Sequence, residues 1–294
     1  MKRYQVEPGE KVDLEEWDPG DVSGVGSEER ARRDSERLTK KLERLQELLH
    51  AEHRHAVLVV LQGMDAAGKD GTIRHVFEGV NPQGVRVVGF KQPTEIERDH
   101  DFLWRVHAPL PALGEMVIFN RSHYEDVLVA RVHKLAPKRA LRHRYEEINE
   151  FERAISDAGT TVLKFFLHIS PEEQIRRLRD RLTDPSKHWK FSATDLVERR
   201  SWAKYRKAYE EALSRTSTPW APWWVVPGNA KWYRDWVVSS VIVRALEGLE
   251  MELPGLSKDA LGSLKDEPWA AAALRKSTRP PGGTGSTRPR GPQG

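Results

Sequence analysis

The sequence predicts an α/β protein with a parallel sheet flanked by helices on both faces. Five short apolar segments, each of a length suited to a buried strand, are separated by stretches with helical periodicity. A glycine-rich loop follows the first segment and leads directly into a helical stretch. Alternation of strands and helices is typical of parallel sheets, whose strands are continuous hydrophobic runs.

The predicted elements begin with an extended polar arm over residues 1–27. An amphipathic helix over residues 28–52 follows, because leucines recur there at helical spacing between charged residues. The predicted strands are Ala56–Gln62, Val85–Phe90, Met116–Phe119, Thr161–Ile169 and Trp224–Val226.

Helix signals are clear after the fourth predicted strand. Ser170 can cap a helix with Pro171 at its first position, and Glu173 can close a capping box. This helix is predicted over residues 172–182, and another over about residues 194–215. The polar, basic segment at about residues 181–193 is interpreted as a mobile lid.

One domain is predicted over residues 28–255. The C-terminal extension, residues 256–294, is expected to be disordered from about residue 275, since it is rich in Pro, Gly, Ser and Thr. Residues 275–294 contain five Lys or Arg and no acid, whereas the whole chain has a net charge of +4. The body is therefore near neutral, and an anion site in it requires local clustering of basic residues.

Composition excludes several classes of protein. The chain of 294 residues has no Cys, which rules out disulfides and zinc–thiolate sites. No apolar stretch of about 18 residues occurs and residues 1–10 lack an apolar signal core, so we expect a cytoplasmic protein without a membrane span. The seven Trp residues from Trp189 to Trp236 are interpreted as packing residues, and no nucleic-acid partner is expected.

The loop after the first predicted strand has the P-loop pattern G-x-x-x-x-G-K at Gly63–Lys69. Its glycines let backbone N–H groups converge, and the following helix N-terminus adds partial positive charge. The strand–loop–helix context favours phosphate binding over a merely structural turn. The predicted phosphate-binding residues of this loop are Gly63, Ala66, Ala67, Gly68, Lys69, Asp70, Gly71 and Thr72.

Two carboxylates distinguish this loop from other P-loops. Asp70 stands where a Ser or Thr commonly binds magnesium, and the nearest hydroxyl is that of Thr72. Asp65 lies inside the loop, where a carboxylate beside phosphate is unfavourable without a metal ion or a proton. Asp65 is therefore predicted to bind a metal ion or to orient the attacking oxygen.

A second polar cluster follows the third predicted strand. Adjacent parallel strands place such loops side by side at one edge of the sheet. Arg121 is predicted to bind phosphate through two N–H groups, and Glu125 and Asp126 are candidate magnesium ligands. His123 alone is interpreted as a structural or exposed residue.

Basic residues crowd the predicted lid. Arg181, Lys187 and Lys190 fall at the break after a helix and are predicted to reach bound phosphate when the lid closes. An arginine delivered in this way contributes about 10³–10⁵ to the rate of phosphoryl transfer. The neighbouring Arg176, Arg177 and Arg179 are interpreted as a solvated helix face.

Together these motifs resemble the family-2 polyphosphate kinases. The resembling segments are Gly63–Thr72, Phe90–Thr94, Asp101–Arg105, Phe119–Asp126, Arg181–Phe191 and Ala221–Pro227, within a similarity that extends from about Tyr4 to Glu250. The resemblance implies a thymidylate-kinase-like P-loop fold with a lid, Mg²⁺, and inorganic polyphosphate in a basic channel. It also suggests a homo-oligomer.

The resemblance assigns roles to individual residues. It implies that Asp65, Lys69, Arg121 and Arg181 carry the transfer, and that Asp126 joins Asp65 in binding the metal ion. The nucleotide-binding residues implied by it are Asp101, Arg105, Asn120 and Glu125.

Asn120 bears on the choice of nucleotide. Family members that act mainly on nucleoside diphosphates carry Asp there, followed by Arg-Ser-Trp-Tyr-Asn, whereas this chain has Asn120 and then Arg-Ser-His-Tyr-Glu. The chain therefore resembles class III, which phosphorylates AMP and ADP to ADP and ATP. On this basis, an Asn120→Asp variant is expected to lose AMP activity more than ADP activity.

Two other functions stay open from the sequence. One is an ATP-dependent kinase of a nucleotide or small metabolite, which the missing Ser or Thr after Lys69 disfavours. The other is a non-enzymatic polyanion-binding protein that uses the basic tail at residues 275–294. Formation of ADP from AMP and polyphosphate without ATP separates the first from a polyphosphate kinase, and deletion of the tail separates the second.

Overall fold

The computed structural model describes residues 1–264, 267 and 269–270. The chain divides into two compact units, Met1–Glu252 and a second that begins at Leu253 and contains helix α11 (Lys258–Ser263). The disorder expected from about residue 275 lies outside the described residues. No helix in the described ranges is both long and apolar enough to span a membrane.

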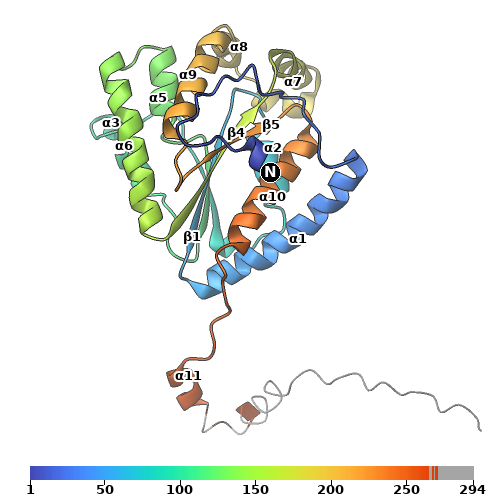
Figure 1. Cartoon of the computed structure of the whole chain (residues 1–294), viewed down its shortest axis with the longest axis vertical. Coiled ribbons are helices and arrows are strands. Elements are labelled where there is room, and N and C mark those ends of the chain that lie inside the picture. Colours follow the sequence, from blue (N-terminus) through green and yellow to red (C-terminus); the bar gives the residue numbers. More distant parts are fainter. Residues whose placement is uncertain (265–266, 268, 271–294) are drawn as a thin grey trace, which may run out of the picture. The chain divides into compact units, whose positions relative to one another are not determined.

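The first unit is built on five parallel strands in the order β2-β3-β1-β4-β5 (Figure 1). These are β1 (Ala56–Gln62), β2 (Val85–Gly89), β3 (Met116–Asn120), β4 (Thr160–His168) and β5 (Trp223–Pro227). Each strand lies within one residue of its predicted bounds. The predicted α/β fold with a parallel sheet is confirmed.

Helices cover both faces of this sheet (Figure 1). One face carries α1 (Glu28–Glu52), α2 (Lys69–Val76) and α10 (Lys231–Glu247), and the other carries α5 (Glu125–Val132), α6 (Lys138–Asp157) and α9 (Trp202–Thr216). The shorter or peripheral helices are α3 (Glu95–Arg98), α4 (Trp104–His107), α7 (Pro171–Thr183) and α8 (Ala193–Arg199), with 3₁₀ turns η1 (Lys2–Tyr4), η2 (Pro82–Gly84) and η3 (Pro185–Lys190).

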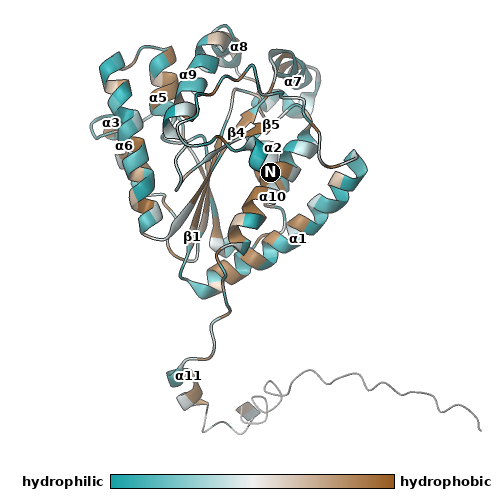
Figure 2. Ribbon diagram, in the orientation of Figure 1, coloured by the Kyte–Doolittle hydropathy of each residue, from teal (hydrophilic) through white to brown (hydrophobic). Residues whose placement is uncertain are grey.

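The core lies on both sides of β1, whose seven residues are all buried. Leu58 and Val60 pack toward α5, α6 and α9, whereas Val57, Val59 and Leu61 pack toward α1 and α10. This alternation is the period-2 geometry of a strand. Figure 2 shows the consequence as hydrophobic strands enclosed by helices with hydrophilic outer faces. The loops that follow the carboxyl ends of the strands are therefore anchored in a well-packed core.

The helix predicted over about residues 194–215 is in fact two helices. α8 ends at Arg199, and α9 begins at Trp202 after a break at Arg200 and Ser201. Tertiary contacts fix α8 in its own direction: the Arg199 guanidinium donates to the Pro171 carbonyl at 3.2 Å. Because of the break, α8 runs in a different direction from α9, and its residues line a cleft of the first unit.

The start of α7 is predicted correctly, but its capping box is not formed. Ser170 Oγ accepts the N–H of Glu173 at 3.2 Å, as a cap should. The N–H of Ser170, however, donates to Asn229 Oδ1 at 3.0 Å. Glu173 instead holds Arg176 and Arg177.

The N-terminal arm packs on the outer edge of the sheet. Gln5 forms an antiparallel bridge with Trp224, and the N–H of Val6 donates to the Trp223 carbonyl at 2.9 Å. The hydroxyls of Tyr4 and Tyr233 lie 2.6 Å apart. The arm therefore covers the free edge of β5, which would otherwise expose unpaired backbone groups.

Candidate active site

The glycine-rich loop after β1 turns tightly, since three of its residues have positive φ angles. Gly63, Ala66 and Gly68 have positive φ angles of 155°, 62° and 102°. Space also restricts Gly68, because a Cβ there would lie 2.1 Å from Nη1 of Arg234. The loop ends at Lys69, the first residue of α2.

Arg177 of α7 supports this loop from behind. Its Nη1 donates to the carbonyls of Ala66 and Ala67 at 3.0 and 2.7 Å. Because a trans peptide directs its N–H opposite its C=O, the N–H of Gly68 faces away from Arg177. The interpretation of Arg177 as part of a solvated helix face is wrong, since this residue is only 6% exposed.

Lys69 folds back across the loop. Its Nζ donates to the carbonyl of Gly63 at 2.8 Å and lies 3.4 Å from that of Met64. Burial, together with the charge of Arg121, lowers the pKa of Lys69 from 10.5 to about 8, against an opposing effect of Asp65. The ammonium is thus poorly solvated, and a bound anion would stabilise its charge.

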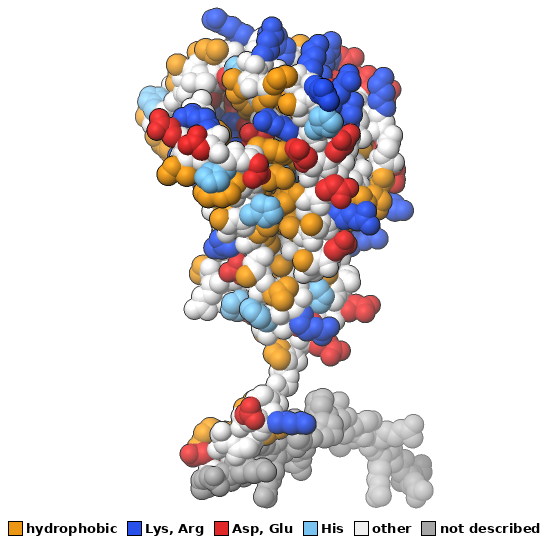
Figure 3. Space-filling model, turned by 90° about the vertical axis from the view of Figure 1, so that its left-hand side faces the viewer, with side chains coloured by type: hydrophobic (Ala, Val, Ile, Leu, Met, Phe, Trp, Pro, Cys, Tyr) orange, Lys and Arg blue, Asp and Glu red, His pale blue; other side chains and the backbone are white. Residues whose placement is uncertain are grey.

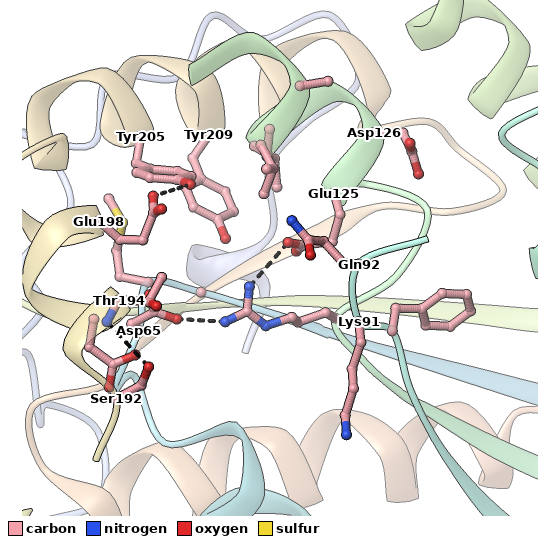
Figure 4. A pocket seen from close by; sticks show the side chains of 18 of the residues that line it. Asp65, Lys91, Gln92, Glu125, Asp126, Ser192, Thr194, Glu198, Tyr205 and Tyr209 are labelled. Atoms are coloured by element: carbon pink, nitrogen blue, oxygen red, sulfur yellow. Dashed lines mark hydrogen bonds and ion pairs between the residues drawn. The ribbon is translucent and has the colours of Figure 1, made fainter. Parts of the chain in front are cut away.

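The loop after β3 places Arg121 opposite Asp65. Nη2 of Arg121 lies 2.6 Å from Asp65 Oδ1, and Nη1 lies 3.1 Å from Glu125 Oε2; dashed lines in Figure 4 mark both pairs. Although burial opposes it, Glu125 and Asp65 raise the pKa of Arg121 above its usual value, so Arg121 stays charged. Its φ of 63° is a left-handed conformation that is strained for a non-glycine residue.

A basic channel of about 440 Å³ runs along the glycine-rich loop. Nine Lys or Arg side chains line it against three Asp. The basic residues are Lys69, Lys91, Arg121, Arg177, Arg181, Lys187, Lys190, Lys231 and Arg234. Figure 3 shows Lys and Arg side chains gathered at the upper end of the first unit. This excess positive charge suits a ligand with several negative charges.

A second cleft of about 570 Å³ lies on the other side of Arg121. Its charged lining includes Arg105, Glu125 and Asp126, and Arg105 Nη2 pairs with Asp126 Oδ2 at 3.0 Å. Its apolar and aromatic lining is formed by Leu128, Val129, Ala130, Leu135, Trp202, Tyr205 and Tyr209. We call it the acceptor cleft. It suits a ligand with an anionic end and a flat, largely apolar end.

The channel and the acceptor cleft meet at four residues that line both: Asp65, Phe90, Lys91 and Arg121. Two ligands with their ends at this junction would face each other beside the Asp65–Arg121 pair. The geometry therefore suits transfer of a group from one anionic ligand to another.

Most predicted residues of the phosphate loop line the channel, but not all. Ala66, Gly68, Lys69, Asp70 and Gly71 do so, and Gly63 lines the acceptor cleft instead. The exceptions are Ala67 and Thr72, which are fully buried and line neither space. The N–H of Ala67 donates to the Met64 carbonyl at 3.0 Å and the N–H of Thr72 to the Gly68 carbonyl at 2.9 Å, so the phosphate contacts of these two residues stay a prediction.

Two predicted nucleotide contacts also lie elsewhere. Asp101 is exposed and accepts the N–H of Leu103 at 2.9 Å in a local turn, outside both spaces. Asn120 lines the channel rather than the acceptor cleft, and its Nδ2 donates to Asp70 Oδ1 at 2.7 Å. Arg105 and Glu125 do line the acceptor cleft, as predicted.

The basic residues of the segment predicted to be a lid lie at the channel. Lys187 and Lys190 of η3 line it, and Arg181 of α7 lines it while pairing with Asp195 Oδ2 at 2.8 Å. Trp189, between the two lysines, is 77% exposed, so its interpretation as a packing residue is wrong. For Trp223, which is only 1% exposed, the interpretation as a packing residue is confirmed.

Several lining residues have no signal in the sequence. Lys231 and Arg234 come from the first turn of α10, more than 150 residues after the phosphate loop. Glu198 and Tyr205, joined by a hydrogen bond of 2.7 Å, come from α8 and α9 (Figure 4). Only the fold brings these groups to the two spaces.

The donor groups near the junction fit a hard divalent cation. Asp65 and Glu125 flank the same guanidinium, and magnesium at phosphate sites commonly takes one or two carboxylates plus phosphate oxygens. No cluster of three or more His, Cys, Asp or Glu able to hold a metal occurs among the described residues. Asp126 pairs with Arg105 and lies apart from Asp65 in Figure 4, so the structure does not bring the predicted metal pair together.

Comparisons with known proteins agree with this geometry. Residues 26–254 match the model of the family described as polyphosphate kinase 2. The chain is 56% identical over 255 residues to an AMP/ADP-polyphosphate phosphotransferase of Meiothermus ruber, covering 86% of this chain and 96% of that protein. It is 45% identical over 269 residues to an ADP-polyphosphate phosphotransferase of Rhodopseudomonas palustris, covering 86% and 92%.

A solved structure is also similar. The crystal structure of polyphosphate kinase 2 from Arthrobacter aurescens TC1 superimposes with a TM-score of 0.86 at 40% sequence identity. The match covers 94% of this chain and 96% of that one. The similarity thus extends over the channel, the acceptor cleft and the helices that carry them.

Proposed function

Because this chain belongs to the polyphosphate kinase 2 family, we propose that it transfers the terminal phosphate of inorganic polyphosphate to AMP and to ADP. The chain is a phosphotransferase of the P-loop kinase type. The relatives named above act on AMP and ADP or on ADP, with polyphosphate as the other substrate. ADP and ATP are the proposed products.

The observation that carries this proposal is the meeting of a basic channel with a mixed cleft beside Asp65 and Arg121. Polyphosphate is a chain of anionic groups and matches the nine basic side chains of the channel. AMP and ADP have an anionic end and an aromatic base, which match the charged and the aromatic lining of the acceptor cleft. The base would lie against Leu135, Trp202 and Tyr205.

The proposed reaction is a direct displacement. A terminal phosphate oxygen of the nucleotide attacks the last phosphorus of polyphosphate, the bridging P–O bond breaks, and the bridging oxygen stays on the shortened chain. Lys69 and Arg121 stabilise the negative charge that develops on the transferred group, since they are fixed before the reaction. Arg181, held by Asp195, adds a further positive charge on the lid side.

A divalent metal ion is part of this chemistry in phosphotransferases, and we propose Mg²⁺. Asp65 and Glu125 are the side chains that would hold it. The ion would neutralise part of the phosphate charge. The protein itself would orient the reactants: Arg121 holds both carboxylates, and the Gly68 N–H and Lys69 bind phosphate.

One assay tests the function directly. Purified protein with AMP, Mg²⁺ and polyphosphate, but no ATP, is expected to form ADP first and ATP afterwards. Omission of polyphosphate should stop both products. Product formation only when ATP is supplied as donor would contradict the proposal and favour an ATP-dependent kinase.

The pKa of Lys69 predicts proton uptake on binding of polyphosphate. Free Lys69, with a pKa of about 8, is largely neutral at high pH, and bound phosphates should raise its pKa toward the usual value. Near about pH 9 binding should therefore take up as much as about one proton, and near pH 6.5 none from this group. Titration calorimetry in two buffers of different ionisation enthalpy measures this. Equal uptake by wild type and Lys69→Met would contradict it.

The position of Asn120 changes the expected effect of Asn120→Asp. The new carboxylate would lie beside Asp70 in the channel, where Asn120 now donates a hydrogen bond. Repulsion between the two carboxylates and from polyphosphate should raise the KM for polyphosphate about tenfold, equally with AMP and ADP. Steady-state kinetics with both acceptors measures this. A loss confined to AMP would instead support a direct contact between Asn120 and the nucleotide.

A homo-oligomer in the cytoplasm, where AMP and ADP are available, completes the proposal. The edge strand β2 supports self-association, since Val87 on it is 53% exposed. Sedimentation velocity measures the oligomeric state, and a monomer at micromolar concentration would contradict the proposed homo-oligomer.

A further inference from the structure

Two buried polar side chains lie between the phosphate loop and the Arg121 loop and have no role in the steps above. Gln62 is the last residue of β1, directly before Gly63, and Ser122 directly follows Arg121. Both are fully buried. Nε2 of Gln62 donates to Ser122 Oγ at 3.1 Å, and Ser122 Oγ also accepts the N–H of Tyr124 at 3.2 Å.

Tyr209 of α9 extends this connection into the acceptor cleft. Its hydroxyl donates to Gln62 Oε1 at 3.3 Å, and its ring lies 4.5 Å from that of Phe166 on β4. Burial and the nearby Glu125 raise the pKa of Tyr209 well above its usual range, so the hydroxyl stays protonated and can donate. Figure 4 shows Tyr209 reaching into the cleft from α9.

The two loops need a connection of this kind. β1 and β3 pair as far as Leu61 and Asn120, and beyond these residues the side-chain pairs Arg121–Asp65 and Asn120–Asp70, which line the open channel, connect the loops. Lys69 and Arg121 must nevertheless act on the same phosphate. A shift of about 1 Å between such groups can cost about a hundredfold in rate.

We propose that Tyr209, Gln62 and Ser122 form a clamp that holds the phosphate loop and the Arg121 loop in register, with Tyr209 as a positioning residue for phosphoryl transfer. The proposal rests on the proposed function for its kinetic test. The clamp binds at both loop roots, since its members adjoin Gly63 and Arg121. It should therefore affect the alignment of the charged groups more than the binding of either substrate.

Tyr209→Phe tests the clamp with little risk to folding, because the ring keeps its contact with Phe166. The expected result is a kcat about tenfold lower, with KM values for AMP and polyphosphate changed less than about threefold. Tyr145→Phe is the matched control: it removes the hydroxyl of another buried tyrosine, on α6, which lines neither the channel nor the acceptor cleft. This control should stay within about twofold of wild type.

Ser122→Ala cuts the other end of the clamp. Because both substitutions break one connection, the double variant should lose no more than about the larger single loss. Multiplied losses, an unchanged kcat in Tyr209→Phe, or an effect confined to KM would overturn the clamp.

A readout without turnover separates the clamp from the proposed function. Amide hydrogen exchange over residues 63–68 and 121–125 should be faster in Tyr209→Phe than in wild type, whether or not the protein uses polyphosphate. Unchanged exchange there would refute the clamp, whereas wild-type protein without polyphosphate-dependent turnover would refute the proposed function.

Discussion

Lys69→Met is expected to lower polyphosphate-dependent turnover at least about a hundredfold, the usual effect of removing one preorganised charge from a transition state. Nζ of Lys69 lies 2.8 Å from the Gly63 carbonyl and is poorly solvated, so its charge is available to a phosphate. Methionine keeps the length and the apolar stem of the side chain. The loss should therefore report the charge rather than a cavity.

Two measurements test whether the loss comes from the charge of Lys69 and not from misfolding. Thermal unfolding should show a midpoint close to that of wild type or above it, because a buried ammonium that is unfavourably solvated is removed. Lys40→Met, which removes an exposed lysine of α1, should keep turnover within about twofold. Near-normal turnover of a folded Lys69→Met protein would exclude Lys69 from the transfer.

Local patterns explain why so much of the fold could be predicted. β1 has the predicted bounds because its apolar run Ala56–Leu61 lies between the polar His55 and Gln62, directly before the glycine at position 63. The break between α8 and α9 could not be predicted in this way. Arg200 and Ser201 are tolerated in helices, and what separates α8 is its tertiary contacts, such as that of Arg199 with Pro171.

The same distinction holds for the site. Asp65 and Arg121 lie at the ends of adjacent strands, so a rule about parallel sheets was sufficient to bring them together. Arg177 could not be told from Arg176 by composition, since only the packing of α7 turns it toward the loop. Asn120 lines the channel and not the acceptor cleft, a difference that the sequence could not show because it depends on the direction of one side chain at the end of β3.

Arg121→Gln is expected to have a larger effect than Lys69→Met, with turnover about 10³-fold below wild type. Arg121 and Lys91 both line the two spaces, and Arg121 also pairs with Asp65 and Glu125. Its removal takes away a charge next to the transferred phosphate. It also leaves two carboxylates that repel the phosphates of both substrates.

Charge and geometry can be separated by Arg121→Lys. Lysine restores the positive charge but cannot bind Asp65 and Glu125 through two fixed N–H groups, so it should recover only about tenfold of the loss. Arg142→Gln, an exposed arginine of α6, is the matched control and should stay near wild type. Full recovery by lysine would mean that Arg121 acts only as a charge. Turnover of Arg121→Gln within about tenfold of wild type would mean that the junction of channel and cleft is not where phosphate is transferred.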